Sequence, residues 1–556
     1  MAGWVRALGA AARGKTGVVA ARMGKGNKAI GRRAGRVRLL PAVVFALVAG
    51  LGVAYVAYQV LHGVTPTSDV KAAPLDLTRV ALTVVAGVGG VVALVVAYRR
   101  QRDLEQSKFV ERFGAAAAQL GATDVAVRIA GVYAMAGVAD ETEGLHRQQC
   151  IDVLCGYLRL PYTPELGANH QTKDVRKYPA ADPAGPETER HFEYRQNDRE
   201  VRNTIVRVIA DHLKPDAEYS WSASNFDFRT AHFDDVHFYS AIFSGKARFD
   251  RAVFGGGAWF TEAKFHGETG FGGATFHGDT GFVGATFGGA AEFVARFGGA
   301  TFVGNAWFER ASFGAGAWFE RATFGAGAWF ERATFGAGAW FDGARFNGST
   351  GFGRATFHGD TRFDVVELNR DARFDNAVFH GSTGFAGTIF GGDIRFDQAT
   401  FHGGVGFEKA AFAGNAGFSA ATFGASARFS EAVFHGDAEF DQATFSGNAD
   451  FDRITCHGSA GFDMATFGYG ALFGGATFND EARFSRATFI GGARFDQVAF
   501  NAQTTFTATD FGSARISFTA PRQWGPPPPH FDWPDDGTGK PANITPTPWP
   551  PTVPPL

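Results

Sequence analysis

The chain has 556 residues, enough for several domains, and its formal net charge of −2 is unevenly distributed. Residues 1–38 carry ten Lys or Arg and no acid, whereas residues 221–520 carry 31 acidic and 22 basic residues, a balance of −9. The three cysteines form no C-x-x-C pair, which argues against a disulfide framework or a cysteine zinc site. Phenylalanine stands out, with 58 residues beside 74 glycines.

Two uncharged stretches, residues 39–61 and 80–98, follow the basic leader 1–38. Each is long enough to cross a hydrocarbon core of about 30 Å as a helix. Arginines flank the pair on its outer sides, so we expect a hairpin in the plasma membrane with both chain ends in the cytoplasm. The lipid bilayer is then one partner, and the leader contacts anionic headgroups. The alternatives are two buried core helices and a leader that binds nucleic acid.

Residues 101–219 carry apolar side chains at helical spacing and are predicted to form a small all-α module. Three amphipathic helices are expected within 101–160. A fourth is expected in "NDREVRNTIVRVIADHL", with Asp198 as its N-cap. The polar, proline-containing stretch 164–189 is predicted to be a loop. Cys150 and Cys155 lie among apolar residues, which favours core packing over a reactive thiol.

This region also carries a resemblance to a known module. The stretches "ERFGAAAAQLGATDVAVRIAGVYAMAGVA", "VLCGYLR" and "NDREVRNTIVRVIADHL" are similar to the helical module that precedes the repeats in many bacterial membrane-anchored pentapeptide-repeat proteins. The resemblance covers residues 110–214 and implies no activity for them.

From Phe249 to Phe511 the chain carries a ladder of phenylalanines at alternating steps of five and six, with one slip at Phe297 and with Leu368 and Cys456 in two slots. On an α-helix, at about 100° per residue, such steps put successive rings on opposite faces. A coiled coil with this period would not tolerate glycine in nearly every repeat. A flat strand would also turn some rings outward. A chain that turns a corner after each ring buries all of them, and glycine-rich corners are expected, where positive φ is cheap.

A small residue stands two positions before most ladder rings, as in "AWF", "ATF" and "ARF". This pattern resembles the pentapeptide repeat A-[DN]-L-x-x in its Phe-centred form, and "FRTAHFDDVHFYSAIF" at 228–243 matches it best. The extra residue in every second unit elsewhere departs from the usual spacing of that family. The resemblance implies a right-handed quadrilateral all-β solenoid over residues 226–518.

The spacing also predicts the size of this solenoid. Sides of five, six, five and six residues give coils of 22 residues, and histidines recur at that interval. About 13 coils at about 4.8 Å each give a rod roughly 60 Å long. Residues 200–226 are expected to cap one end, and the segment after Phe511 the other. The proline-rich tail 519–556 is predicted to be disordered or polyproline II.

Tryptophans at an 11-residue spacing occupy outward positions and are expected to alternate between opposite sides of the solenoid. Exposed tryptophan with arginine is typical of protein contacts, although a duplicated, tolerated surface residue is an equal alternative. The candidate partner-binding residues are Trp307, Trp318, Trp329, Trp340, Arg310, Arg321 and Arg332.

Histidines 22 residues apart are expected to stack about 5 Å apart, which makes them weak candidates for a metal site. The alternative is a polar corner that faces water, because no carboxylate or cysteine recurs with them. These histidines are His358, His380 and His402. No other cofactor is predicted.

No nucleophile–base pair, Walker loop or dinucleotide loop stands out, so no catalysis is predicted. The first functional hypothesis is a membrane-anchored cytoplasmic scaffold for an unknown protein partner, with oligomers possible. The alternative is a DNA-mimicking pentapeptide-repeat protein that interacts with a topoisomerase. A balance of −9 over 300 residues is mild for such mimicry. A metal-binding histidine rod is the third hypothesis, and a nucleic-acid partner is not expected.

Overall fold

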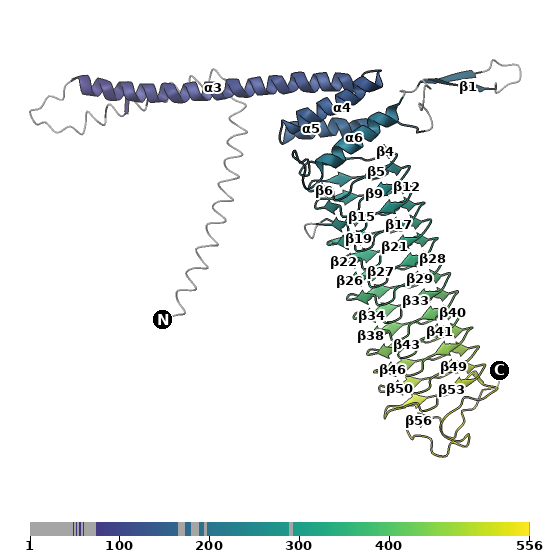
Figure 1. The fold of residues 1–556 in the computed structure, drawn as a ribbon. Helices are drawn as coiled ribbons and strands as arrows, with labels where there is room; N and C mark the ends of the chain where they lie inside the picture. The colour runs from purple at the N-terminus through teal and green to yellow at the C-terminus, as the bar shows by residue number, and fades with distance from the viewer. Residues whose placement is uncertain are drawn as a thin grey trace, which may run out of the picture. The chain divides into compact units, whose positions relative to one another are not determined.

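The structure is a computed structural model that describes residues 48, 52, 55, 56, 59, 74–164, 173–179, 188–193, 197–288 and 293–554. The chain divides into two compact units, residues 1–111 and 112–556. The second unit contains a group of helices and a stack of short strands, coloured teal to yellow along the chain (Figure 1).

The first described element is α3 (Pro74–Leu120), a helix of 47 residues that includes the whole predicted span 80–98. The helix does not stop there, because residues 99–113 contain good helix formers and neither proline nor glycine. The predicted span 39–61 lies outside the described residues, five single positions excepted. Within the described part of the chain, no helix combines the length and the apolar character needed to cross a membrane. The expected transmembrane hairpin is therefore not found there.

Three further helices form the core of the module, namely α4 (Val125–Asp140), α5 (Leu145–Leu158) and α6 (Asp198–His212). Cys150 and Cys155 are fully buried among them, and burial raises the pKa of the Cys155 thiol to about 12. That environment suits a core residue and not a nucleophile.

The expected N-cap role of Asp198 is wrong. Asn197 precedes α6 and makes no side-chain cap bond. The Asp198 carboxylate instead lies 2.6 Å from Nη1 of Arg128 and 2.9 Å from Nε of Arg202, two arginines that are almost completely buried. The Tyr157 hydroxyl donates to the same carboxylate at 2.6 Å. Two desolvated guanidinium groups require a carboxylate partner, and this requirement decides where Asp198 points.

The predicted loop 164–189 contains a hairpin instead. Strands β1 (Lys173–Tyr178) and β2 (Thr188–Glu193) pair antiparallel, with Lys173 opposite Glu193. Arg176 lies over the Phe192 ring at 5.6 Å, and Arg190 lies over the Tyr178 ring at 5.3 Å. Aromatic residues in strands with cross-strand cationic partners stabilise the pairing, so the module is not purely helical.

The solenoid is built of four parallel sheets with 12, 15, 14 and 13 strands (Figure 1). Its strands have only two or three residues and run from β3 (Phe226–Asp227) to β56 (Ile544–Thr545). Phe324 pairs with Phe302 in the coil before and Phe346 in the coil after, each 22 residues away. The prediction of a four-sided β-solenoid with 22-residue coils is confirmed, with about 13 turns. The handedness stays an expectation from the resemblance.

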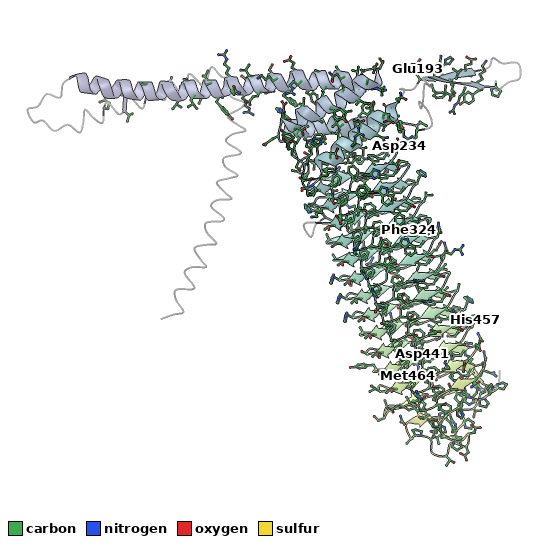
Figure 2. All side chains as sticks on the ribbon, in the orientation of Figure 1. Glu193, Asp234, Phe324, Asp441, His457 and Met464 are labelled. Atoms are coloured by element: carbon green, nitrogen blue, oxygen red, sulfur yellow. The ribbon has the colours of Figure 1, made fainter. Side chains whose placement is uncertain are left out.

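The ladder rings fill the interior of the coils (Figure 2 labels Phe324), and those between Phe249 and Phe506 are at most 1% exposed, except Phe293 before the slip, which is only half-buried. Phe319 stacks on Phe341 one coil away at 5.0 Å and 2°, and meets Phe330 edge-on at 5.6 Å and 86°. Both arrangements are favourable for aromatic pairs. Each buried ring contributes on the order of 1.5–3 kcal/mol, so the ring columns are the core of the fold.

The corners differ from the prediction. The left-handed residues are mostly not glycine, and they follow the ladder ring by two positions, as Arg321 does with φ of 56°. The glycine-rich corners have another cause. A Cβ on Gly403 would collide with the carbonyl of Gly381 in the preceding coil. Glycine is therefore needed at this position because successive coils approach closely, and not because the backbone has a positive φ.

The start of the solenoid is covered by α6 and the residues after it. The Trp221 side chain is completely buried, stacks on His212 at 4.0 Å, and donates from Nε1 to Asp140 at 2.8 Å. The amide of Ile242 donates to the Leu213 carbonyl at 2.8 Å. The predicted cap at residues 200–226 therefore covers the first coil and satisfies its edge.

The proline-rich tail is ordered over its described residues, which corrects the prediction of disorder. Strand β55 (Gln523–Trp524) pairs with β52 (Ala499–Phe500), and β56 pairs with β54 (Ile516–Ser517). Phe518, which lies beyond the predicted ladder and stacks on Phe495 at 4.8 Å, meets Trp524, Phe531 and Trp549 at 5.7–5.8 Å. The aromatic residues between the prolines cover a ring layer that would otherwise face water.

Candidate protein-binding faces of the solenoid

The four predicted tryptophans lie on two opposite sides of the coil, as their spacing predicts. Trp307 and Trp329 end β17 (Ala306–Trp307) and β21 (Ala328–Trp329) in the 13-stranded sheet. Together with Trp259 of the same sheet they form the first tryptophan face. Trp318 and Trp340 end β19 (Gly316–Trp318) and β23 (Gly338–Trp340) in the 15-stranded sheet and form the second tryptophan face.

These indoles are half-buried and not fully exposed as expected. A Cβ on Gly257, Gly327 or Gly338 would lie 2.7–2.9 Å from the ring of the tryptophan two residues later. The ring therefore lies flat over that glycine. The glycine in "GAW" is the sequence feature that could have indicated this packing. The prediction explained that glycine only as a corner residue.

On the second face the two indoles are the middle of a four-layer stack. Trp318 and Trp340 stack at 5.2 Å and 8°. Arg296 covers the outer side of Trp318 at 5.7 Å, and Arg362 covers the outer side of Trp340 at 5.5 Å. The sequence analysis missed both arginines, although they hold the same outward position one coil away. Both flat sides of each ring are occupied, so only the ring edges are open to a partner.

The first face has a different arrangement. Trp259 and Trp307 stack at 5.9 Å although one coil separates them, because Gly281 of that coil has no side chain to keep them apart. A hollow of about 540 Å³ opens beside them, and its surface is mostly apolar. The residues that line it are Trp259, Val283, Trp307, Glu309, Arg310, Glu331 and Arg332.

The charged residues of this hollow are not equally accessible. Glu309 and Glu331 each keep one buried Oε2 atom without a hydrogen-bond partner. Burial raises the pKa of both carboxyl groups, and the nearby charge of Glu309 raises that of Glu331 further. Arg310 and Arg332 are exposed, and over the described ranges neither forms an ion pair with a carboxylate. The charge that a partner meets first is therefore positive.

The raised pKa values predict how stability depends on pH. The folded state binds these protons more tightly than the unfolded chain, so the charged carboxylates destabilise the fold at neutral pH. We expect Glu309→Gln with Glu331→Gln to unfold at higher urea concentration than the wild type near pH 8. The difference in urea midpoint between the double variant and the wild type should narrow as the pH falls. It should vanish near pH 4, around the ordinary pKa of Glu, about 4.3.

The measurement is a set of urea unfolding curves between about pH 8 and about pH 4. Glu439→Gln is the control, because that exposed residue holds an outward position of the same sheet. A gap between the double variant and wild type that does not change with pH would contradict the assignment.

Many aspartates of the solenoid hold its backbone. Asp441 (labelled in Figure 2) accepts from the Asp463 amide at 2.9 Å, and Asp364 accepts from the Ala386 amide at 2.8 Å. Each bond joins one coil to the next, 22 residues later. These carboxylates satisfy backbone donors, which is a structural use of charge that DNA mimicry does not require.

The predicted histidine stack is present. His358, His380 and His402 lie 5.1 Å and 4.8 Å apart with rings parallel within 7°. His457 (labelled in Figure 2) stacks in the same way on His435 at 5.0 Å. Rings stacked in parallel face each other, so their nitrogen atoms do not point toward a common position where a metal ion could bind. Among the described residues no group of three or more His, Cys, Asp or Glu is arranged to hold a metal ion.

The fold and these two faces define a repeat solenoid that offers extended surfaces. Comparison with protein families agrees. A family model described as pentapeptide repeats (9 copies) matches residues 228–275, 293–334, 366–411, 403–444 and 440–488. The matched segments of the solenoid therefore consist of Phe-rich pentapeptide repeats. Proteins of this family are generally structural or scaffold proteins without catalysis. Among curated proteins and solved structures, none matches the chain.

Proposed function

We propose that this chain is a non-catalytic scaffold whose solenoid binds a protein partner through its tryptophan faces. The observation that carries the proposal is the placement of the tryptophans. The outward tryptophans of the repeat coils all fall between Trp259 and Trp340, on two opposite sheets. Elsewhere the same positions hold residues such as Arg373, Gly417 and Thr505. Tryptophan and arginine are the residue types that contribute most to protein interfaces.

The construction of the rod supports this role. Each coil is bonded to the next along all four sheets, and the ring columns leave the backbone little freedom. A surface that is rigid before binding loses little conformational entropy in the complex. Extended solenoid surfaces commonly serve as binding platforms for this reason.

The test is proximity labelling from the full chain in its native cells. We expect at least one enriched protein with the wild type and its loss with Trp307→Thr plus Trp329→Thr, or with Trp318→Ser plus Trp340→Ser. Thr505 and Ser517 hold the equivalent outward positions, so these changes suit the fold. Glu439→Thr is the control. Equal labelling by the wild type and both double variants would contradict the proposal.

The position of the scaffold in the cell stays a prediction from the sequence. The basic residues around the stretches 39–61 and 80–98 motivate attachment to the plasma membrane with the solenoid in the cytoplasm. Protease treatment of intact cells tests it, because cleavage of the solenoid from outside would overturn the cytoplasmic placement.

A further inference from the structure

We propose that the hollow at the first tryptophan face binds an acidic protein segment that inserts an apolar side chain beside Trp307. The carboxylates of this segment pair with Arg310, Arg332 and Arg354. The inference rests on the proposed scaffold function and names the chemistry of the partner.

Three arginines form a column that begins at the rim of this hollow: Arg310 and Arg332 line it, and Arg354 continues the column one coil further. Arg310, Arg332 and Arg354 hold the same turn position in successive coils, with φ of 55°, 57° and 58°. Strand spacing in a parallel sheet puts their backbones about 4.8 Å apart from one coil to the next. All three side chains are exposed, and no carboxylate among the described residues forms an ion pair with them.

A charged stretch on the opposite corner, in coils further along the chain, is built differently. There Glu431 stands between Lys409 and Arg453, and it lies 3.8 Å from the lysine and 2.7 Å from the arginine. These three charges alternate in sign and neutralise one another. In the column of Arg310, Arg332 and Arg354 every member is positive. Like charges one coil apart repel each other, and carboxylates supplied by a partner relieve that repulsion.

The neighbouring acids do not provide these carboxylates. Glu309 and Glu331 precede two of the arginines in sequence, but each has a buried oxygen atom and carries no ion pair within the described residues. A Cβ on Gly351 would collide with the Glu331 carboxylate, which therefore lies over the next coil.

The apolar part of the site favours a protein over a nucleic acid. Val283 and the two stacked indoles give the hollow an apolar lining, which suits an aliphatic or aromatic side chain. Trp259 and Trp307 already stack on each other at 5.9 Å, so no base fits between them. A duplex also needs a longer run of cations than three successive coils provide.

The experiment selects a phage-displayed random-peptide library on the full chain. We expect enriched peptides that combine several Asp or Glu with an apolar or aromatic residue. The variant Arg310→Gln, Arg332→Gln and Arg354→Gln should lose this enrichment and bind the selected peptide about tenfold or more weakly. Gln398 and Gln442 hold the same left-handed position, so the triple variant keeps its turns.

Two controls separate the site from general effects. Arg321→Gln lies on the opposite corner, where Gln497 holds the same turn position, and should bind the selected peptide like the wild type. Val283→Asp should weaken binding, because it places a charge in the apolar hollow. Circular dichroism and a melting curve for each variant confirm that the fold is retained.

Several results would overturn the inference. Basic peptides, no enriched peptides, or the same peptides with the triple variant would each reject it. A labelled DNA duplex that binds through the three arginines, without a peptide, would assign the site to nucleic acid and also reject it. If the selection fails while the double variants still lose a labelled partner, only this inference falls. If both fail, the scaffold proposal falls as well.

Discussion

Replacing Phe412 by alanine is expected to lower the free energy of unfolding by about 3–5 kcal/mol. The Phe412 ring is completely buried and stacks between Phe390 at 4.7 Å and Phe434 at 4.5 Å. Its removal leaves a cavity that the rigid coils cannot close, and two neighbouring rings each lose a stacking partner. Urea unfolding of the purified chain, followed by near-ultraviolet circular dichroism, measures the loss.

Phe412→Leu is the matched control, because Leu368 holds the equivalent slot two coils earlier and is fully buried there. Leucine keeps most of the buried volume that alanine removes, so this change should lower the free energy of unfolding clearly less than the alanine change does. Each repeat contacts only its neighbours, so hydrogen exchange in the alanine variant should increase mainly in the coils around residue 412. Equal losses for alanine and leucine would contradict the view that stacked ring volume holds the rod together.

Removing residues 519–556 is expected to lower the melting temperature and to cause association of the chains. The truncation uncovers the Phe518 ring and removes the strand partners of β52 and β54. An open sheet edge beside an exposed ring layer is a template for another chain. Light scattering coupled to gel filtration measures the association, and scanning calorimetry measures the melting temperature.

A shorter truncation provides the control. Removal of residues 552–556 keeps Trp549, which contacts Phe518 at 5.8 Å and Phe531 at 5.3 Å, so it should leave both properties unchanged. A monomeric chain with an unchanged melting temperature after the longer truncation would contradict the capping role and support a disordered or polyproline II tail.

The ring ladder shows how much of the fold local pattern predicts. Steps of five and six, with a small residue two positions before most rings, predict a chain that turns a corner after each ring and buries it. The resemblance to the pentapeptide repeat implied the four sides, which the four sheets confirm. The same reasoning located the opposite tryptophan sides and the histidine stack. Both follow from the period alone, because residues 22 apart must lie above one another.

The candidate site needed more than the period. Arg296 and Arg362 matter because they lie on the flat sides of Trp318 and Trp340. The hollow exists because Gly281 lets Trp259 approach Trp307. Each feature depends on the side chain that lies one coil above or below, about 22 residues away in sequence. A local sequence pattern does not show such contacts. The arginine column differs from the charged stretch of the opposite corner in having no ion pairs among the described residues, which the sequence does not show.

By itself the sequence determined the coil, its 22-residue repeat and its buried rings, since hydrophobic period and steric room act locally and repeat identically. The sequence also placed a cap after Phe511, but only the tertiary structure showed that the proline-rich tail is ordered and forms it. Tertiary structure alone decided the buried ion pairs of Asp198 and the hairpin within the helical module. Each of these depends on a contact between residues far apart in sequence, such as Asp198 with Arg128 or Trp549 with Phe518. A buried charge such as that of Arg128 needs a carboxylate partner, and a ring at the end of the solenoid needs an apolar cover. Which residue supplies the partner or the cover depends on the fold and not on the local sequence.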